Sequence, residues 1–466
     1  MSNISKLVIQ QAIKNIISRV DSISEKNTKR VFKLLIWINR RDPLAQKQIM
    51  DIQDAVENDK PLGILIKRIL NEMHPNVRKK FVFNFVLNNA YGSNAEKRER
   101  FKKSEGFYPP FTILISPSMR CNLRCVGCYA GEYSQKDDLP YQVVERIINE
   151  ARELGIYFFT ILGGEPFICD YMWDIFSKYD DAAFQVFTNG TMLDEKTVRH
   201  IIKLGNVMPI ISLEGSQEET DSRRGKGIYQ KTMLALDQLR QANALYGFSV
   251  MVTRENAETI CRDPFNQLMV EKGCYLGWHF LYMPVGRNPD MSLMPTPEQR
   301  EFMRTHGAAR IRNEFPLFVA DFWNDAPYVG GCIAAGRDYL HINSNGDIEP
   351  CIFAHFAVDN IKEKTLREAL ASPFFKAIRE RQPFSENLLM PCQLIDHPHI
   401  FREIYGKYHP RPTHPGAESL VTNLSGQLDS YSTNVKSIME NAWEKDFRSR
   451  GYQYIGKKVV DSKTNQ

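Results

Sequence analysis

The chain has 466 residues, of which 43% are hydrophobic and 25% are charged, enough to bury one large domain with smaller ones attached. No apolar run approaches the roughly 18 residues that cross a bilayer, so we expect no transmembrane span. Nine cysteines without a signal peptide predict a reducing, cytoplasmic compartment, where thiolates serve metal centres rather than disulfides.

The net charge of +5 is distributed unevenly. Residues 1–110 hold 21 basic and 11 acidic side chains, whereas the remainder holds 39 and 44. A basic module therefore precedes an acidic one. The apolar stripe within 9–20 and the segments 31–38 and 77–87 predict helices, and the charged segment 96–103 predicts a linker into the next domain.

The basic helices leave two roles open. An amphipathic basic helix can lie on an anionic membrane surface, which would give peripheral membrane contact. It can equally pack against its own protein with its lysines in water. No basic stripe with interleaved aromatic residues is present, so no nucleic acid is expected as a partner.

Strand-like and helical patterns alternate after this module. Strand-like runs lie near 111–116, 157–162, 183–188, 207–213, 247–253 and 275–283, with helical patterns such as 141–152 and 231–239 between them. Such alternation predicts parallel βα units. The run that ends near 286 is expected to be the last strand of a partial barrel.

The first strand leads into three cysteines with the spacing C-x3-C-x2-C: Cys121, Cys125 and Cys128. Active sites of β/α barrels lie at the carboxyl ends of the strands, where this loop is predicted. Three thiolates supply an iron–sulfur cluster with all but one of the four ligands it needs, so one iron stays open. A zinc site or a group of core cysteines can share this spacing.

The second strand ends in Gly163, Gly164, Glu165 and Pro166. The glycines leave backbone groups approachable, the proline fixes the turn, and the glutamate can accept hydrogen bonds from a bound cation. In this order and separation, the triad and the GGEP segment resemble those of the radical S-adenosylmethionine (radical SAM) enzymes. The resemblance implies a 4Fe–4S cluster on the triad, SAM chelating the open iron, and a contact between GGEP and the SAM amino group.

Later segments resemble the same family. Asn189 and Ser212 lie in segments that border the cofactor there, and Ser212 matches a position that contacts SAM. Arg224 matches an Arg-Gly segment of the peptide-modifying branch. Its guanidinium group can bind the SAM carboxylate through two hydrogen bonds. A solvent-exposed arginine would fit the same charged loop. The family usually has an aromatic residue or histidine where this chain has Gly127. Tyr129 or backbone groups are therefore expected to contact the adenine of SAM.

A second cysteine set follows the barrel: Cys332, Cys351 and Cys392. Asn345-Gly346 between two apolar runs predicts a hairpin before Cys351. The arrangement resembles a SPASM/Twitch extension and implies one auxiliary iron–sulfur cluster, although ordinary reduced cysteines could share it. The candidates for its fourth ligand are Cys169, Cys261, Cys274, Asp396, His397 and a substrate atom.

The expected protein is therefore an α/β chain with a partial (β/α)6 barrel, an N-terminal helical module and a small C-terminal hairpin-plus-helix cluster-binding extension. The expected domains are 1–107 (basic helical module and linker), 108–315 (radical SAM barrel), 316–410 (SPASM/Twitch-like extension) and 411–466 (polar tail with a helix near 435–443).

The resemblance implies reductive cleavage of SAM to a 5′-deoxyadenosyl radical, which abstracts hydrogen from an unactivated carbon. The expected substrate is large and partly apolar, either a lipid chain or a peptide, and the N-terminal module is expected to help deliver it. An electron donor of the flavodoxin or ferredoxin type is the implied partner. The alternatives are an iron–sulfur electron-transfer protein without SAM chemistry and a zinc-stabilised binding module.

Overall fold

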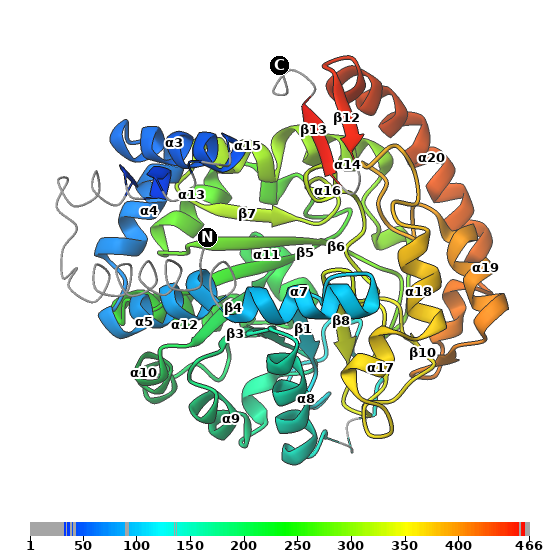
Figure 1. Cartoon of the computed structure of the whole chain (residues 1–466), viewed down its shortest axis with the longest axis horizontal. Helices are drawn as coiled ribbons and strands as arrows, with labels where there is room; N and C mark the ends of the chain where they lie inside the picture. Colours follow the sequence, from blue (N-terminus) through cyan, green and yellow to red (C-terminus); the bar gives the residue numbers. More distant parts are fainter. Residues whose placement is uncertain are drawn as a thin grey trace.

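The structure is a computed structural model that describes residues 32–461, apart from positions 34, 38–39, 41–42, 89–92, 135, 137 and 456–457. Its centre is a nine-stranded sheet in the order β7-β6-β5-β4-β3-β2-β1-β8-β9, which curls into a partial barrel (Figure 1). The strands are Thr112–Ile115 (β1), Phe158–Ile161 (β2), Ala183–Thr188 (β3), Val207–Leu213 (β4), Gly247–Val252 (β5), Leu276–Leu281 (β6), Phe318–Asp321 (β7), Tyr339–Ile342 (β8) and Ile348–Glu349 (β9).

The six strands expected from the sequence are confirmed as β1 to β6. The expectation that β6 is the last strand was wrong, because β7 pairs in parallel with β6 and β8 pairs in parallel with β1. Tyr339 of β8 lies beside Thr112, and β9 completes the hairpin predicted at Asn345-Gly346. The extension thus continues the barrel sheet, because β8 satisfies the otherwise unpaired edge of β1.

Helices alternate with the strands, and most of them cover the outer face of the sheet (Figure 1). They are α8 (Tyr141–Glu153), α9 (Met172–Lys178), α10 (Glu195–Leu204), α11 (Gln217–Arg224), α12 (Ile228–Gln241), α13 (Asp263–Glu271), α14 (Pro297–His306), α15 (Ala308–Glu314) and α16 (Ala326–Val329). Neighbouring strands place Ile113, Phe159 and Phe184 in register in the core beneath them. Side chains alternate along a strand, so Ser212 and Ser249, which also lie in register, face the barrel interior.

The N-terminal module is helical where the structure describes it, and the stripe predicted within 9–20 lies outside the described residues. Its helices are α3 (Pro43–Glu57), α4 (Pro61–Asn71), α5 (Pro75–Lys80), the π-helix η1 (Phe81–Leu87) and α7 (Ser93–Glu105). Asn84 donates to Ala182 O before β3 (2.9 Å), and Arg68 donates to Cys274 O before β6 (3.2 Å). The helices α4, α5 and η1 therefore lie at the amino ends of the strands (Figure 1).

The segment 96–103, predicted as a linker, is part of the helix α7. Arg98 donates to the carbonyls of Pro109 and Pro110 (2.8 and 2.9 Å), and Lys97 donates to Arg152 O at the end of α8 (2.8 Å). The charged run is thus a helix whose basic side chains donate to backbone carbonyls before β1 and at the end of α8.

The remaining elements belong to the C-terminal region. They are β10 (Phe356–Ala357), α17 (Leu366–Leu370), α18 (Pro373–Glu380), α19 (Pro398–Tyr408), β11 (Arg411–Pro412), α20 (Ser425–Trp443), the π-helix η6 (Glu444–Arg448), β12 (Tyr452–Ile455) and β13 (Lys458–Asp461). The helix expected near 435–443 lies within α20, but the region after residue 410 packs against the extension instead of forming a separate tail. Helix α20 has an apolar stripe along one face of an otherwise polar sequence. This stripe packs Val435, Met439 and Trp443 against Leu388 and Met390.

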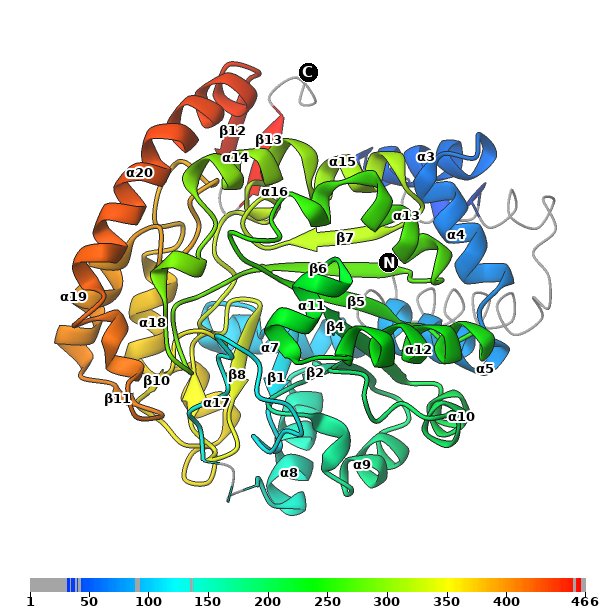
Figure 2. The ribbon, with the colours of Figure 1, turned by 180° about the vertical axis from the view of Figure 1, so that it is seen from behind.

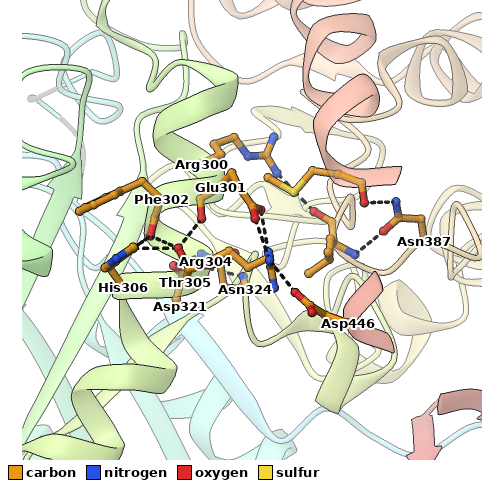
Figure 3. A network of polar contacts seen from close by, with 12 residues as sticks. Arg300, Glu301, Phe302, Arg304, Thr305, His306, Asp321, Asn324, Asn387 and Asp446 are labelled. Carbon is orange, nitrogen blue, oxygen red and sulfur yellow. Dashed lines mark hydrogen bonds and ion pairs between the residues drawn. The ribbon is translucent and has the colours of Figure 1, made fainter. Parts of the chain in front are cut away.

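Polar contacts also hold the C-terminal region in place, as Figure 3 shows. Arg304 of α14 pairs with Asp446 after α20 at 2.8 Å. Asn387 donates to Met439 O within α20 at 3.0 Å. The second contact holds the loop that leads to Cys392. Among the described residues, no helix is both long and apolar enough to cross a membrane.

We expect Arg300→Met to lower the free energy of unfolding by about 3–5 kcal/mol, because it leaves the buried negative charge of Asp396 without its partner. Arg300 pairs with Asp396 at 2.5 Å, and the two side chains are 3% and 0% exposed. Urea unfolding followed by circular dichroism measures the loss. The control is Arg402→Met, whose pair with Asp429 is 26% and 49% exposed and is worth about 1 kcal/mol or less. Equal losses in both variants would contradict the argument.

Candidate active site

The cysteine triad lies on the loop after β1, at the carboxyl ends of the parallel strands. Two other elements hold this loop. Val126 N donates to Arg223 O in the last turn of α11 (2.9 Å), and Arg287 N, beyond β6, donates to Cys128 O (3.0 Å). The fold thus gathers three distant parts of the chain around the triad.

Gly127, where the chain departs from the family pattern, is required by its surroundings. Its φ is +62°, and an added Cβ would stand 2.6 Å from the ring of Tyr282. Tyr282 follows β6, is fully buried, and fills the space beside Gly127. Tyr129, expected near the adenine, donates from its hydroxyl to Gly163 O (3.5 Å) and has its ring centre 6.2 Å from that of His355. Tyr129 therefore lies between the GGEP turn and the extension.

The GGEP turn docks directly on the triad loop. An added Cβ at Gly163 would stand 2.4 Å from Ser118 O, and one at Gly164 would stand 2.2 Å from Arg120 O. Only glycine permits so close an approach. Glu165 N donates to Arg120 O at 2.8 Å. The two motifs, separate in sequence, form one surface.

The Glu165 carboxylate is fully buried and already accepts three hydrogen bonds from the protein. Oε1 accepts from Phe167 N (3.2 Å) and Thr188 Oγ1 (2.8 Å), and Oε2 accepts from Asn189 N (2.8 Å). A carboxylate has about four acceptor positions, so Oε2 keeps one for a ligand. Burial raises the pKa of Glu165, and these hydrogen bonds oppose the rise. Pro166 begins the 3₁₀ turn η2 (Pro166–Ile168) that presents Phe167 N.

Asn189 and Ser212 lie at the carboxyl ends of β3 and β4. Asn189 Nδ2 donates to Asn122 Oδ1 at 2.8 Å and stands 3.9 Å from Cys121 Sγ, so it borders the triad. Ser212 Oγ lies 3.3 Å from Ser249 Oγ across the β4–β5 pair. Both serine hydroxyls belong to the interior face of the barrel.

Arg224 is not a solvated arginine. Its side chain is 10% exposed, and Nη2 lies 2.6 Å from Glu214 Oε1. Arg223 pairs with the same carboxylate oxygen, while Glu214 Oε2 accepts from Met251 N (3.2 Å). Two guanidinium groups share one carboxylate, which leaves a net positive charge next to the triad loop. The sequence reasoning missed Glu214 and Arg223, although Glu214 directly follows a buried strand and an Arg-Arg pair ends the next helix.

The triad thiols lie near one another, with Cys125 buried and Cys121 and Cys128 half-buried. Burial raises the pKa of Cys121 to about 11, and the nearby Glu165, Cys125 and Cys128 raise it further. Burial also raises the pKa of Cys128, whereas Arg223 lowers it. Thiols that oppose one another's ionisation in this way become thiolates when a positively charged metal centre binds them. Soft sulfur donors with an adjacent positive charge fit an anionic iron–sulfur cluster.

The auxiliary set also comes together. Cys332 precedes β8, Cys351 follows β9, and Cys392 precedes α19. Burial raises the pKa of Cys332 to about 12, and Cys351 adds to the rise. The pKa of Cys392 is raised by burial, by Asp396 and by the other two thiols. The three auxiliary cysteines, far apart in sequence, therefore lie near one another.

Hydrogen-bond donors lie against two of these sulfurs, those of Cys351 and Cys392. Phe353 N donates to Cys351 Sγ and Leu394 N donates to Cys392 Sγ, both at 3.4 Å. The Tyr339 hydroxyl lies 3.0 Å from Cys351 Sγ. Half-buried sulfurs that receive N–H and O–H groups fit the ligands of an iron–sulfur cluster. No three His, Cys, Asp or Glu side chains in the described part of the chain converge on a single metal ion, whereas a cluster spreads its ligands over several irons.

The protein side chains named as candidates for a fourth auxiliary ligand have neighbours outside the auxiliary set. Cys169, Cys261 and Cys274 are buried with charged neighbours outside the set, namely Arg120, Asp321 and Arg68. Asp396 pairs with Arg300 and accepts from Cys392 N (3.0 Å). His397 Nε2 lies 2.9 Å from Met390 O. Asp396 thus positions the Cys392 loop, and its two oxygens are engaged.

A buried network joins the extension to the barrel. Glu349 Oε1 accepts from Tyr133 Oη (2.6 Å) and Thr413 Oγ1 (2.5 Å), and Oε2 lies 2.6 Å from His341 Nδ1. His341 Nε2 lies 2.7 Å from Ser116 Oγ at the end of β1. The Ser-His-Glu order resembles a nucleophilic site, but all three side chains are fully buried and cannot reach a substrate. The network instead links β1, the loop after the triad and the β8–β9 hairpin.

Comparison with known families agrees with this geometry. Residues 115–262 match the radical SAM superfamily, and residues 332–393 match SPASM, an iron–sulfur cluster-binding domain. The triad falls in the first match and the auxiliary set in the second.

The chain is similar to mycofactocin maturase MftC of Mycolicibacterium smegmatis, with 26% identity over 268 residues, 55% of this chain and 67% of the relative. It is also similar to the AdoMet-dependent heme synthase of Methanosarcina barkeri, with 25% identity over 287 residues, 56% of this chain and 81% of the relative. Among solved structures, Streptococcus suis SuiB bound to S-adenosylmethionine matches with a TM-score of 0.54 and 20% identity, covering 72% of this chain and 88% of SuiB. This last likeness concerns the fold.

The family matches and the sheet topology lead to one assignment. A radical SAM domain implies a 4Fe–4S cluster and SAM as cofactors, and a SPASM domain implies an auxiliary iron–sulfur cluster. Both thiol sets fit such clusters in donor type and surroundings. The chain is therefore a radical SAM superfamily enzyme with a SPASM domain after its barrel.

Proposed function

We propose that Cys121, Cys125 and Cys128 hold the SAM-binding cluster. The observation that carries this proposal is the docking of the GGEP turn on the triad loop, with Glu165 N on Arg120 O at 2.8 Å. The residues proposed to contact SAM are Gly163, Gly164, Glu165, Pro166, Asn189, Ser212, Arg224 and Tyr129. When bound, the cluster and SAM supply a 5′-deoxyadenosyl radical able to abstract hydrogen from an unactivated carbon.

The chain's own residues bind and orient in this proposal. The positive charge that Arg223 and Arg224 leave beside Glu214 suits the SAM carboxylate, because a buried guanidinium fork positions a carboxylate. The free acceptor position of Glu165 suits the SAM amino group. These two features favour SAM chemistry over a simple electron-transfer protein, which needs neither. The electron is proposed to come from a flavodoxin- or ferredoxin-type donor.

The auxiliary set is proposed to hold the second cluster. Cys332, Cys351 and Cys392 would bind it, and the network around Glu349 would fix their position relative to the triad. An auxiliary cluster there can accept the electron left on the substrate after hydrogen abstraction, or bind the substrate itself.

A peptide is proposed as the substrate. MftC is a maturase by name, and SuiB has also been solved bound to its precursor peptide SuiA, a structure that matches this chain with a TM-score of 0.52 and 18% identity, covering 68% of this chain and 82% of SuiB. Beside the triad, Val126 is 52% exposed and Met192, three residues after Asn189, is 38% exposed. Exposed apolar side chains at this place suit a partly apolar substrate.

The lipid alternative loses support from the position of the N-terminal module. Its helices α4 and α5 lie at the amino ends of the strands (Figure 2), as does η1, whose Asn84 donates to Ala182 O before β3. The triad, in contrast, follows β1 and lies at the carboxyl ends. Part of the basic charge is also used within the protein, since Lys80 pairs with Asp180 at 2.6 Å. In the described residues, the module packs against the barrel.

The test of the substrate class is mass spectrometry of oxygen-free extracts from deletion cells complemented with the wild-type chain or with Cys121→Ala. We expect a peptide whose mass changes only with the wild-type chain. A change confined to the lipid fraction would refute the peptide proposal, as would one confined to porphyrins. As a second measurement, we expect no salt-sensitive co-sedimentation with anionic vesicles; such binding, lost without residues 1–90, would restore the lipid alternative.

A further inference from the structure

Tyr339 stands where the extension meets the barrel. It is the first residue of β8 and lies in register with Thr112 of β1, so its side chain is on the interior face of the sheet together with that of His341. The ring centre of Tyr339 lies 6.3 Å from that of Phe322, beyond β7, while its hydroxyl reaches Cys351 Sγ at 3.0 Å. Both the strand and the ring packing therefore hold this hydroxyl against one sulfur.

The distance decides what the hydroxyl can do. Two ligands on different irons of a cluster stand farther apart than hydrogen-bond distance, so 3.0 Å is too short for Tyr339 and Cys351 to be such a pair. A phenol is protonated at neutral pH and can donate, and a thiolate can only accept. The contact therefore has the geometry of an O–H···S hydrogen bond.

Cys351 differs from Cys392 in the hydrogen-bond donors that lie against its sulfur. Cys351 Sγ receives the backbone N–H of Phe353 and also faces the Tyr339 hydroxyl, whereas Cys392 Sγ receives the backbone N–H of Leu394. Hydrogen bonds to ligand sulfurs stabilise the more negatively charged, reduced form of a cluster and so raise its reduction potential.

We propose that Tyr339 is a positioning residue whose hydroxyl donates a hydrogen bond to the Cys351 thiolate and raises the reduction potential of the auxiliary cluster. The inference rests on the proposed auxiliary cluster. A higher potential makes that cluster a better acceptor for the electron left on the substrate, so the hydroxyl favours the oxidative outcome of the reaction.

The test uses the full chain carrying Cys121→Ala, Cys125→Ala and Cys128→Ala, so that only the auxiliary cluster contributes to the signal. In this background we compare Tyr339→Phe with the parent in a redox titration followed by electron paramagnetic resonance. We expect the equilibrium constant for one-electron reduction to fall about tenfold, a shift of about 59 mV to lower potential. In heavy water, pulsed electron paramagnetic resonance should detect one fewer exchangeable deuteron coupled to the cluster in Tyr339→Phe than in the parent.

Tyr405→Phe is the matched control, because it also removes a tyrosine hydroxyl from the extension. The ring of Tyr405 packs against Phe356, with 5.4 Å between the ring centres. We expect it to leave the potential unchanged. An unchanged potential in Tyr339→Phe overturns the inference and leaves the cluster assignment standing. Loss of iron in Tyr339→Phe alone overturns it too, since it would make Tyr339 a ligand. No iron in the parent background overturns the auxiliary cluster itself.

Discussion

Replacing Cys121, Cys125 and Cys128 together with alanine is expected to remove about four iron atoms per chain and to abolish 5′-deoxyadenosine formation from SAM. The reason is that all three thiols lie near one another on the triad loop, and the GGEP turn docks on that loop. Iron analysis and chromatography of reaction mixtures, both under oxygen-free conditions with a chemical reductant, measure the two effects.

Cys261→Ala is the control for this experiment, because Cys261 is also buried but belongs to the core at the end of a short 3₁₀ turn. It should keep both the iron and the product. An unchanged iron content in the triple variant would refute the assignment of the triad. Undiminished 5′-deoxyadenosine would show that another set of residues binds SAM.

The second large effect is expected from replacing Cys332, Cys351 and Cys392 together with alanine. This variant should lose the iron of one cluster and all modified substrate, yet still form 5′-deoxyadenosine. The two activities separate because the auxiliary thiols lie in the extension, whereas SAM is proposed to bind on the GGEP turn and the triad loop. Iron analysis, product analysis and 5′-deoxyadenosine measurement on one preparation test all three statements.

The same Cys261→Ala chain serves as the control here. A full iron content in the auxiliary variant would mean that these three cysteines hold no cluster. Loss of both clusters together would point to the Glu349 network, since Tyr133 links the loop after the triad to Glu349, two residues before Cys351. In that case Glu349→Gln should reproduce the loss with every cysteine intact.

The position of the N-terminal module changes what its charge means. From the sequence, a net charge of +10 on apolar helices suited a lipid surface. In the structure, Arg68 donates to Cys274 O and Lys80 pairs with Asp180, so basic side chains tie the module to the barrel. A charge count reports how many basic groups exist, but only their partners decide whether they are available to a membrane.

The hydrogen-bonding role of Glu165 shows a similar difference. The motif alone predicted a glutamate that faces the cofactor, whereas its carboxylate mainly holds the end of β3 through Thr188 and Asn189. Short motifs name the residue types at a site. They do not tell which of the acceptor positions the protein has already used.

The sequence by itself determined the two cysteine sets, the GGEP turn and the order of β1 to β6, because local spacing and alternation of apolar residues specify parallel βα units. Only the tertiary structure decided that β8 joins β1, that Tyr282 fills the space beside Gly127, and that Arg223 and Arg224 share Glu214. The physical reason is range. Secondary structure follows from neighbouring residues, whereas these contacts form between segments whose meeting depends on how the whole sheet closes.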